Sequence, residues 1–75
     1  MPMNSTYTAI IEKDDDVYTS LCPELDIASQ GDTYDEAKSN LIEAVQLFFE
    51  CASQTEVIKR LRKEYFITPF EVEVA

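Results

Sequence analysis

The chain has 75 residues and a formal net charge of −9, because 15 acidic residues outnumber six basic ones and histidine is absent. This length allows one domain, and so small a domain is marginally stable alone, which favours a homo-oligomer. An acidic surface repels phosphate, so direct binding of nucleic acid is disfavoured, whereas binding of a basic protein is favoured. The alternative is that the acidity only keeps a small domain in solution.

Residues 1–5 have neither the basic region nor the apolar region of a signal peptide, and no apolar run has the length of a membrane span. We therefore expect a cytoplasmic protein that does not bind membranes. Its two cysteines, Cys22 and Cys51, are expected to be reduced and buried, with a disulfide as the less favoured alternative.

Three β-strands are expected in the first part of the chain, where β-branched and aromatic residues alternate with polar ones. The expected strands cover residues 6–12, 17–22 and 27–29, with a polar hairpin turn at 13–16 and a loop at 23–26. Pro23 ends the second strand because its nitrogen carries no hydrogen.

A long helix is expected to follow. Gly31, the only glycine, stands between strand and helix and is expected to reverse the chain with a positive φ. Thr33 and Glu36 form a capping-box pattern, in which each side chain bonds the backbone N–H of the other. An apolar stripe at helical spacing then indicates a face packed in the core, with a ligand pocket beneath it as the alternative. The stripe consists of Ala37, Leu41, Ala44, Val45, Phe48 and Ala52.

The last third of the chain predicts a second, short helix and a final strand. A break at residues 53–55 precedes the expected helix at 57–65, with Thr55 and Glu56 as its cap; one helix over 33–64 is the alternative. After Pro69, alternation with two glutamates predicts a strand whose apolar face self-associates. That face consists of Phe70, Val72 and Val74. The order β-β-β-α-(α)-β indicates an α+β fold, with a mainly antiparallel sheet and one main helix packed on one face.

The residue types do not favour an enzyme, a metal site or a cofactor. Without histidine, the usual nucleophile–base pairs cannot be built, and the chain has neither a Gly-rich phosphate loop nor a Cys-x-x-Cys motif. The carboxylates of residues 14–16 point in different directions on a hairpin tip, so a solvated turn is favoured over a cation site. The basic cluster at residues 59–63 is expected to be a solvated face, or to pair with the acidic body of a second subunit, rather than to bind phosphate.

Three motifs together resemble the HicB family of antitoxins. They are Tyr-Thr-Ser-Leu-Cys-Pro-Glu-Leu at residues 18–25, Gln-Gly-Asp-Thr-x-x-Glu-Ala at 30–37 and Asn-Leu-x-Glu-Ala at 40–44. Their order and spacing match the family over roughly residues 6–50. The resemblance implies a partly degraded ribonuclease-H-like fold that lacks the metal-binding carboxylates of a nuclease.

The same resemblance implies a function. HicB-type proteins neutralise a small basic HicA-type toxin, an RNA-cleaving enzyme, by covering its active surface, and they form dimers or tetramers. An orphan module that homo-oligomerises without a toxin is the alternative, and a residual nuclease is a distant third possibility.

Two departures from the family pattern matter. Residues 1–75 are expected to form a single HicB-like domain, because a C-terminal DNA-binding domain has no room after the last strand. The Pro-Gly-Cys that commonly follows Pro-Glu-Leu is replaced by Asp26-Ile27-Ala28, which changes the loop.

The partner contact is expected at the end of the second strand, where an aromatic anchor adjoins acidic groups that pair with Arg or Lys. The expected contact residues are Tyr18, Cys22, Pro23, Glu24, Leu25 and Asp26. The alternative is that Tyr18 and Leu25 are ordinary core residues.

Overall fold

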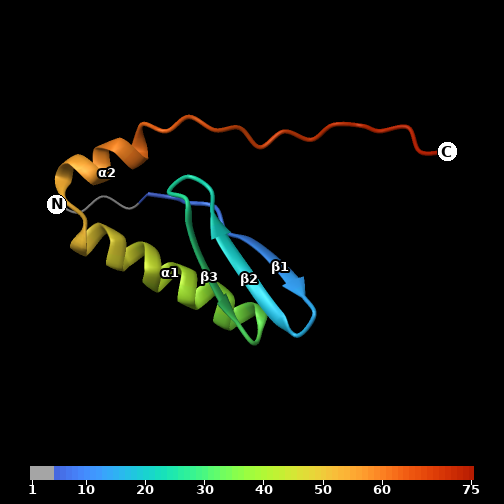
Figure 1. Cartoon of the computed structure of the whole chain (residues 1–75), viewed down its shortest axis with the longest axis horizontal. Helices are drawn as coiled ribbons and strands as arrows, with labels where there is room; N and C mark the ends of the chain where they lie inside the picture. Colours follow the sequence, from blue (N-terminus) through green and yellow to red (C-terminus); the bar gives the residue numbers. More distant parts are fainter. Residues whose placement is uncertain (1–4) are drawn as a thin grey trace.

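A computed structural model of the protein describes residues 5–75. Its elements are β1 (Ile10–Asp14), β2 (Val17–Cys22), β3 (Ile27–Gly31), α1 (Tyr34–Cys51) and α2 (Gln54–Leu61). The strands form an antiparallel sheet in the order β1-β2-β3, α1 lies across one face, and α2 folds back from the end of α1 (Figure 1). The expected α+β class is therefore confirmed.

The first strand is shorter and later than the sequence predicts. β1 begins at Ile10, which pairs with Leu21, and ends at Asp14, which pairs with Val17. Tyr7 and Thr8 have strand-forming side chains, but the continued register would place residues 6–8 opposite Pro23 and the loop after it, outside β2. The hairpin turn is correspondingly tight, with Asp15 in the left-handed region at φ 57.

β2 is the central strand, and its alternation decides which face of the sheet is buried. Ser20 and Cys22 face α1 and are 2% and 1% exposed, whereas Leu21 on the opposite face is 37% exposed. The helix-free face of the sheet is thus open, and the core lies between the sheet and α1. The core is a small cluster of Cys22, Leu25 and Leu41, and many other large apolar side chains of the chain are exposed.

The start of α1 is pressed against the sheet. Thr33 is the N-cap, and its hydroxyl accepts the Glu36 N–H at 3.1 Å. The expected return bond differs by one residue, because the Glu36 carboxylate accepts from the backbone of Asp32 at 3.0 Å rather than from Thr33. The buried Ser20 hydroxyl donates to the carbonyl of Ala37 at 2.9 Å, which ties the first turn of α1 to β2.

Gly31 does not have the positive φ that the sequence predicts; no described glycine has one. It is the last residue of β3, and its role is close approach. A Cβ at this position would lie 2.6 Å from the backbone nitrogen of Ala37. The absence of a side chain therefore allows the helix to start directly against the strand.

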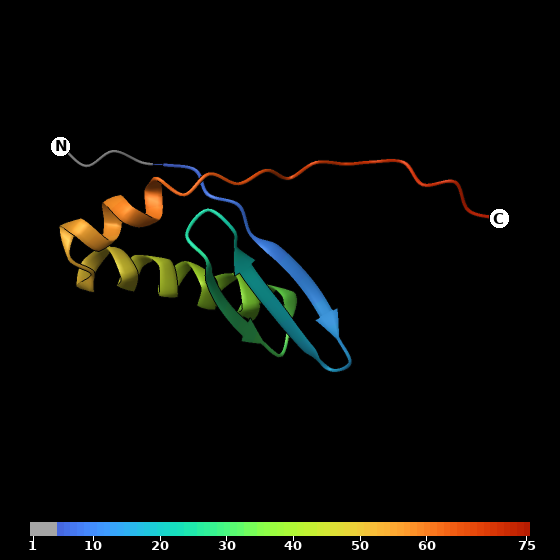
Figure 2. The ribbon, with the colours of Figure 1, turned by 45° about the horizontal axis from the view of Figure 1, so that its top comes forward.

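The break after α1 is confirmed, although the cap of α2 is not the one predicted. Ser53, not Thr55, is the N-cap and accepts from the Glu56 N–H at 3.1 Å, so α2 begins earlier and ends at Leu61 rather than at residue 65. α2 is set at an angle to α1 (Figure 2), and this brings Arg60 of α2 to the β2–β3 loop, where it bonds the Leu25 carbonyl.

The predicted final strand does not form. Residues 62–75 follow α2 as an extended segment, with no strand among them, that leaves the body of the molecule (Figures 1 and 2). A strand is stable only when its backbone N–H and C=O groups are paired, and this segment lies against no strand of its own chain.

Candidate partner-binding site

The loop of residues 23–26 is shaped by two features of its own sequence. The Leu25 N–H bonds the Cys22 carbonyl at 3.3 Å, which closes a turn with Pro23 and Glu24 at its centre. Asp26 then takes a left-handed conformation at φ 55, which aspartate tolerates better than most residues. The turn directs Leu25 inward, where it is fully buried in the core.

Glu24 connects three parts of the chain. Its carboxylate accepts the Thr8 N–H at 2.8 Å and the Cys22 thiol at 3.4 Å, and the Tyr65 hydroxyl also stabilises its charged form. Partial burial alone would raise the pKa of Glu24, but these donors and its own backbone outweigh burial and lower the pKa from 4.5 to about 2. The carboxylate is therefore ionised at neutral pH and already used within the chain.

The same carboxylate and the surrounding apolar side chains act on Cys22. Burial, followed by the hydrogen bond to Glu24 and the charge of Glu24, raises the pKa of the Cys22 thiol. Both cysteines are free, with Cys22 buried and Cys51 exposed, so the expectation of burial is correct for Cys22 and wrong for Cys51.

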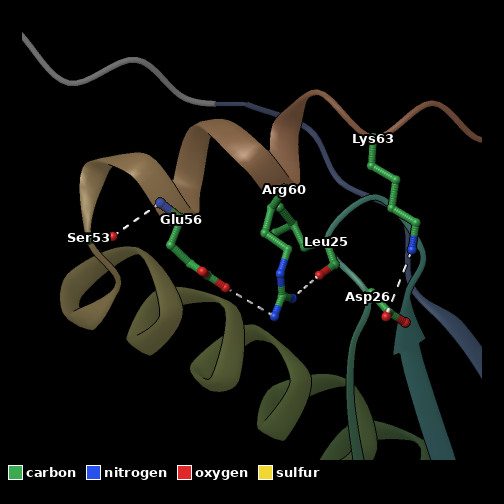
Figure 3. Close-up of polar contacts among 6 residues, drawn as sticks. All are labelled: Leu25, Asp26, Ser53, Glu56, Arg60 and Lys63. Atoms are coloured by element: carbon green, nitrogen blue, oxygen red, sulfur yellow. Dashed lines mark hydrogen bonds and ion pairs between the residues drawn. The ribbon is translucent and has the colours of Figure 1, made fainter.

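Two basic residues of α2 and the segment after it hold the loop from above (Figure 3). The Arg60 guanidinium donates to the Leu25 carbonyl, lies 3.5 Å from the Glu56 carboxylate and sits 5.1 Å from the centre of the Phe48 ring. Lys63 approaches the Asp26 carboxylate to 3.8 Å. These two members of the basic cluster thus contact their own chain instead of forming only a solvated face.

The six residues predicted to contact a partner do not form one surface. Cys22 and Leu25 are core residues, so their side chains have no surface with which to contact a partner. Tyr18 is half-buried at the opposite end of β2 from the loop, with Lys13 over its ring at 5.9 Å. The accessible residues that lie together at the loop are therefore Pro23, Glu24 and Asp26.

Arg60, Lys63 and Tyr65 were not predicted to lie at this site. Arg60 is 35 residues away from Leu25 in the sequence, and no local pattern links them. The only sequence signal was the density of basic residues at 59–63 in an otherwise acidic chain.

Within residues 5–75, no group of three or more Cys, Asp or Glu side chains is arranged to hold a metal ion. Neither of the two described helices is long and apolar enough to cross a membrane.

A second candidate surface lies on the segment after α2. Phe70, Val72 and Val74 are 84%, 66% and 85% exposed. These values leave the predicted self-association face uncovered in a single copy of the chain.

Fold and site together define a small acidic α+β protein with a loop that contacts α2 and an uncovered apolar segment. A UPF0150 protein of Helicobacter pylori strain J99 is 35% identical over 68 residues, which cover 89% of this chain and 94% of the relative. The chain therefore belongs to the UPF0150 family.

Two UPF0150 proteins of Synechocystis are similar over shorter regions. One is 46% identical over 46 residues, which cover 59% of this chain and 58% of the relative. The other is 48% identical over 50 residues, which cover 64% of this chain and 69% of the relative. No protein-family model and no solved structure matches the chain.

Proposed function

We propose that this protein is an antitoxin-like binding protein of the HicB type, which neutralises a small basic HicA-type RNA-cleaving toxin by covering its active surface. The observation that carries the proposal is the distribution of charge. Only Lys13 and Lys38 are basic before residue 59, whereas acidic side chains lie on the hairpin, on the loop and along α1. Such a surface speeds encounter with a basic partner and favours it over acidic ones.

The internal contacts identify which acidic groups are free to act. Glu24 is used within the chain, so its replacement would disturb the fold as well as any interface. Asp26 is mostly exposed and contacts only Lys63 among the ion pairs of the described residues, at the long distance of 3.8 Å. Asp26 is therefore the residue of the loop best suited to pair with an Arg or Lys of the toxin.

The partner is sought by capture of the tagged protein from its own cells at low salt, followed by mass spectrometry. We expect recovery of one small basic protein in stoichiometric amount, with binding that weakens as salt rises. Recovery of the chain alone, or of a partner whose binding does not depend on salt, would contradict the proposal.

Two matched variants test the loop. Asp26→Asn and Asp15→Asn each remove one charge from a left-handed turn position, with φ 55 and φ 57, at opposite ends of the sheet. Asparagine tolerates this conformation, so both variants should fold. We expect only Asp26→Asn to weaken toxin binding, by about tenfold. Equal effects of the two variants would show that the loop is not part of the interface.

The second candidate function is a self-associating module without a toxin. The uncovered apolar residues after α2 favour it, because large apolar side chains left in water usually mark an interface. A defined homo-oligomer that captures no other protein would support this reading. The two functions are alternatives, because the second has no toxin, and for either one we propose a cytoplasmic location.

A further inference from the structure

The open edge of the sheet lies at β1. This strand pairs only with β2, so the N–H and C=O groups along its other side are unpaired within the sheet. Such an edge accepts an added strand from another chain. At the opposite edge, α1 supplies the Asn40 amide, which bonds the Gln30 carbonyl of β3 at 2.8 Å.

An apolar groove lies beside residues 5–9, which lead into β1. α1 packs mainly on β3 and least on β1, which leaves a groove of about 740 Å³ between α1 and the segment that enters β1. Its apolar walls include Tyr7, Leu41, Ile42, Val45 and Phe49. Ile42 and Phe49 are 49% and 38% exposed, so this side of the helix is not covered by its own chain.

The segment after α2 has the complementary pattern. Phe70, Val72 and Val74 lie on one side of an extended backbone, and Glu71 and Glu73 on the other. Residues 70–74 equal β1 in length, and Pro69 before them suits an edge strand, where one missing N–H is tolerated.

The direction of this segment indicates that it fills the groove of a second copy of the chain rather than its own groove. In both views the segment after α2 passes above the end of its own sheet and extends beyond it (Figures 1 and 2), and it pairs with none of the strands. Residues 62–68 contain no glycine, asparagine or aspartate, so the sequence there offers none of the residues that favour a tight reversal.

We propose that residues 70–74 of one copy pair with the β1 edge of a second copy and insert Phe70, Val72 and Val74 into its apolar groove. Reciprocal exchange fills both grooves and closes a two-fold dimer. This inference deepens the second candidate function, self-association, and does not require a toxin.

The pairing fixes the surroundings of the two glutamates. Ile11 pairs with Ser20, so the residues of β1 that face α1 are Ile11 and Lys13, and Glu12 and Asp14 point to the helix-free face. With the apolar side of the segment toward the groove, Glu71 and Glu73 lie beside Glu12 and Asp14. Salt should therefore strengthen the dimer, which is the opposite of its expected effect on toxin binding.

Light scattering after size exclusion, over a range of protein and salt concentrations, tests the dimer. We expect the double variant Phe70→Asp/Val72→Asp to raise the dimer dissociation constant by at least about tenfold. The matched control is Glu71→Gln/Glu73→Gln on the other side of the same segment, which should dimerise as well as or more tightly than the wild type. The changes lie outside the core, and circular dichroism checks that both variants fold.

Cross-linking then identifies the mode of association. Val72→Cys and Ile42→Cys are introduced on separate chains that also carry Cys51→Ser, and the two chains are mixed with a short bis-maleimide. We expect a covalent heterodimer. A monomeric wild type overturns both self-association and strand exchange. An oligomer that survives the Phe70/Val72 changes, or an oligomer in which the two chains form no covalent heterodimer, overturns strand exchange alone.

Discussion

Replacement of Glu24 by glutamine should destabilise the protein through the loss of one charge. The folded state lowers the pKa of Glu24 from 4.5 to about 2. At about 1.36 kcal/mol per unit, this shift corresponds to an upper limit of about 3 kcal/mol at neutral pH. Because the side chain is only partly buried, solvent screening reduces the effect, and we expect a loss of about 1–2 kcal/mol.

The sign of the pH dependence follows from the direction of the shift. A lowered pKa means that the stabilising contribution is complete above pH 4.5 and declines as the pH falls toward 2. At pH 3 most of it should be lost from the wild type. The Glu24→Gln variant has no such contribution, so the stability difference between the two proteins should shrink on acidification.

Urea unfolding followed by circular dichroism, at one fixed protein concentration and at pH 7 and pH 3, measures both effects. Glu43→Gln is the matched control, because it removes the same charge from an exposed position of α1. The proposed role of Glu24 as the connection between Thr8, Cys22 and Tyr65 is refuted if Glu24→Gln is as stable as Glu43→Gln at pH 7, or if the difference between them does not change with pH.

Three further changes test other contacts of the structure. Gly31→Ala should lower stability by about 1–3 kcal/mol in thermal unfolding, because the new methyl group has no space against α1; an unchanged midpoint would contradict the close approach. Arg60→Met should cost about 1–2 kcal/mol by removing the loop hydrogen bond and the cation over Phe48. It should also speed amide exchange in the loop, and unaltered exchange would mean that α2 does not anchor it. A thiol reagent should modify Cys51 rapidly and Cys22 only on unfolding, since burial protects the latter and raises its pKa; two fast thiols would show that the core is open.

The candidate site was only partly predictable. The acidic loop after β2 was located from the sequence, because Pro23 stops a strand and adjacent carboxylates stand out in composition. The sequence did not predict which residues of the loop are free to contact a partner. The burial of Leu25 and the internal bonds of Glu24 depend on segments far along the chain.

The sequence by itself determined the features that depend on neighbouring residues. The strand pattern of β2, the cap at Thr33, the apolar stripe of α1 and the break near Ser53 all arise within a few residues, where side-chain alternation and capping chemistry are decisive.

Only the tertiary structure decided the rest, because it depends on contacts between distant segments. The end of β2 sets the place where β1 begins. Gly31 is needed because α1 approaches it closely, and not because it has a positive φ. The alternation of residues 70–74 signals a strand, but a strand also needs a paired edge, and the chain's own sheet does not provide one at that position.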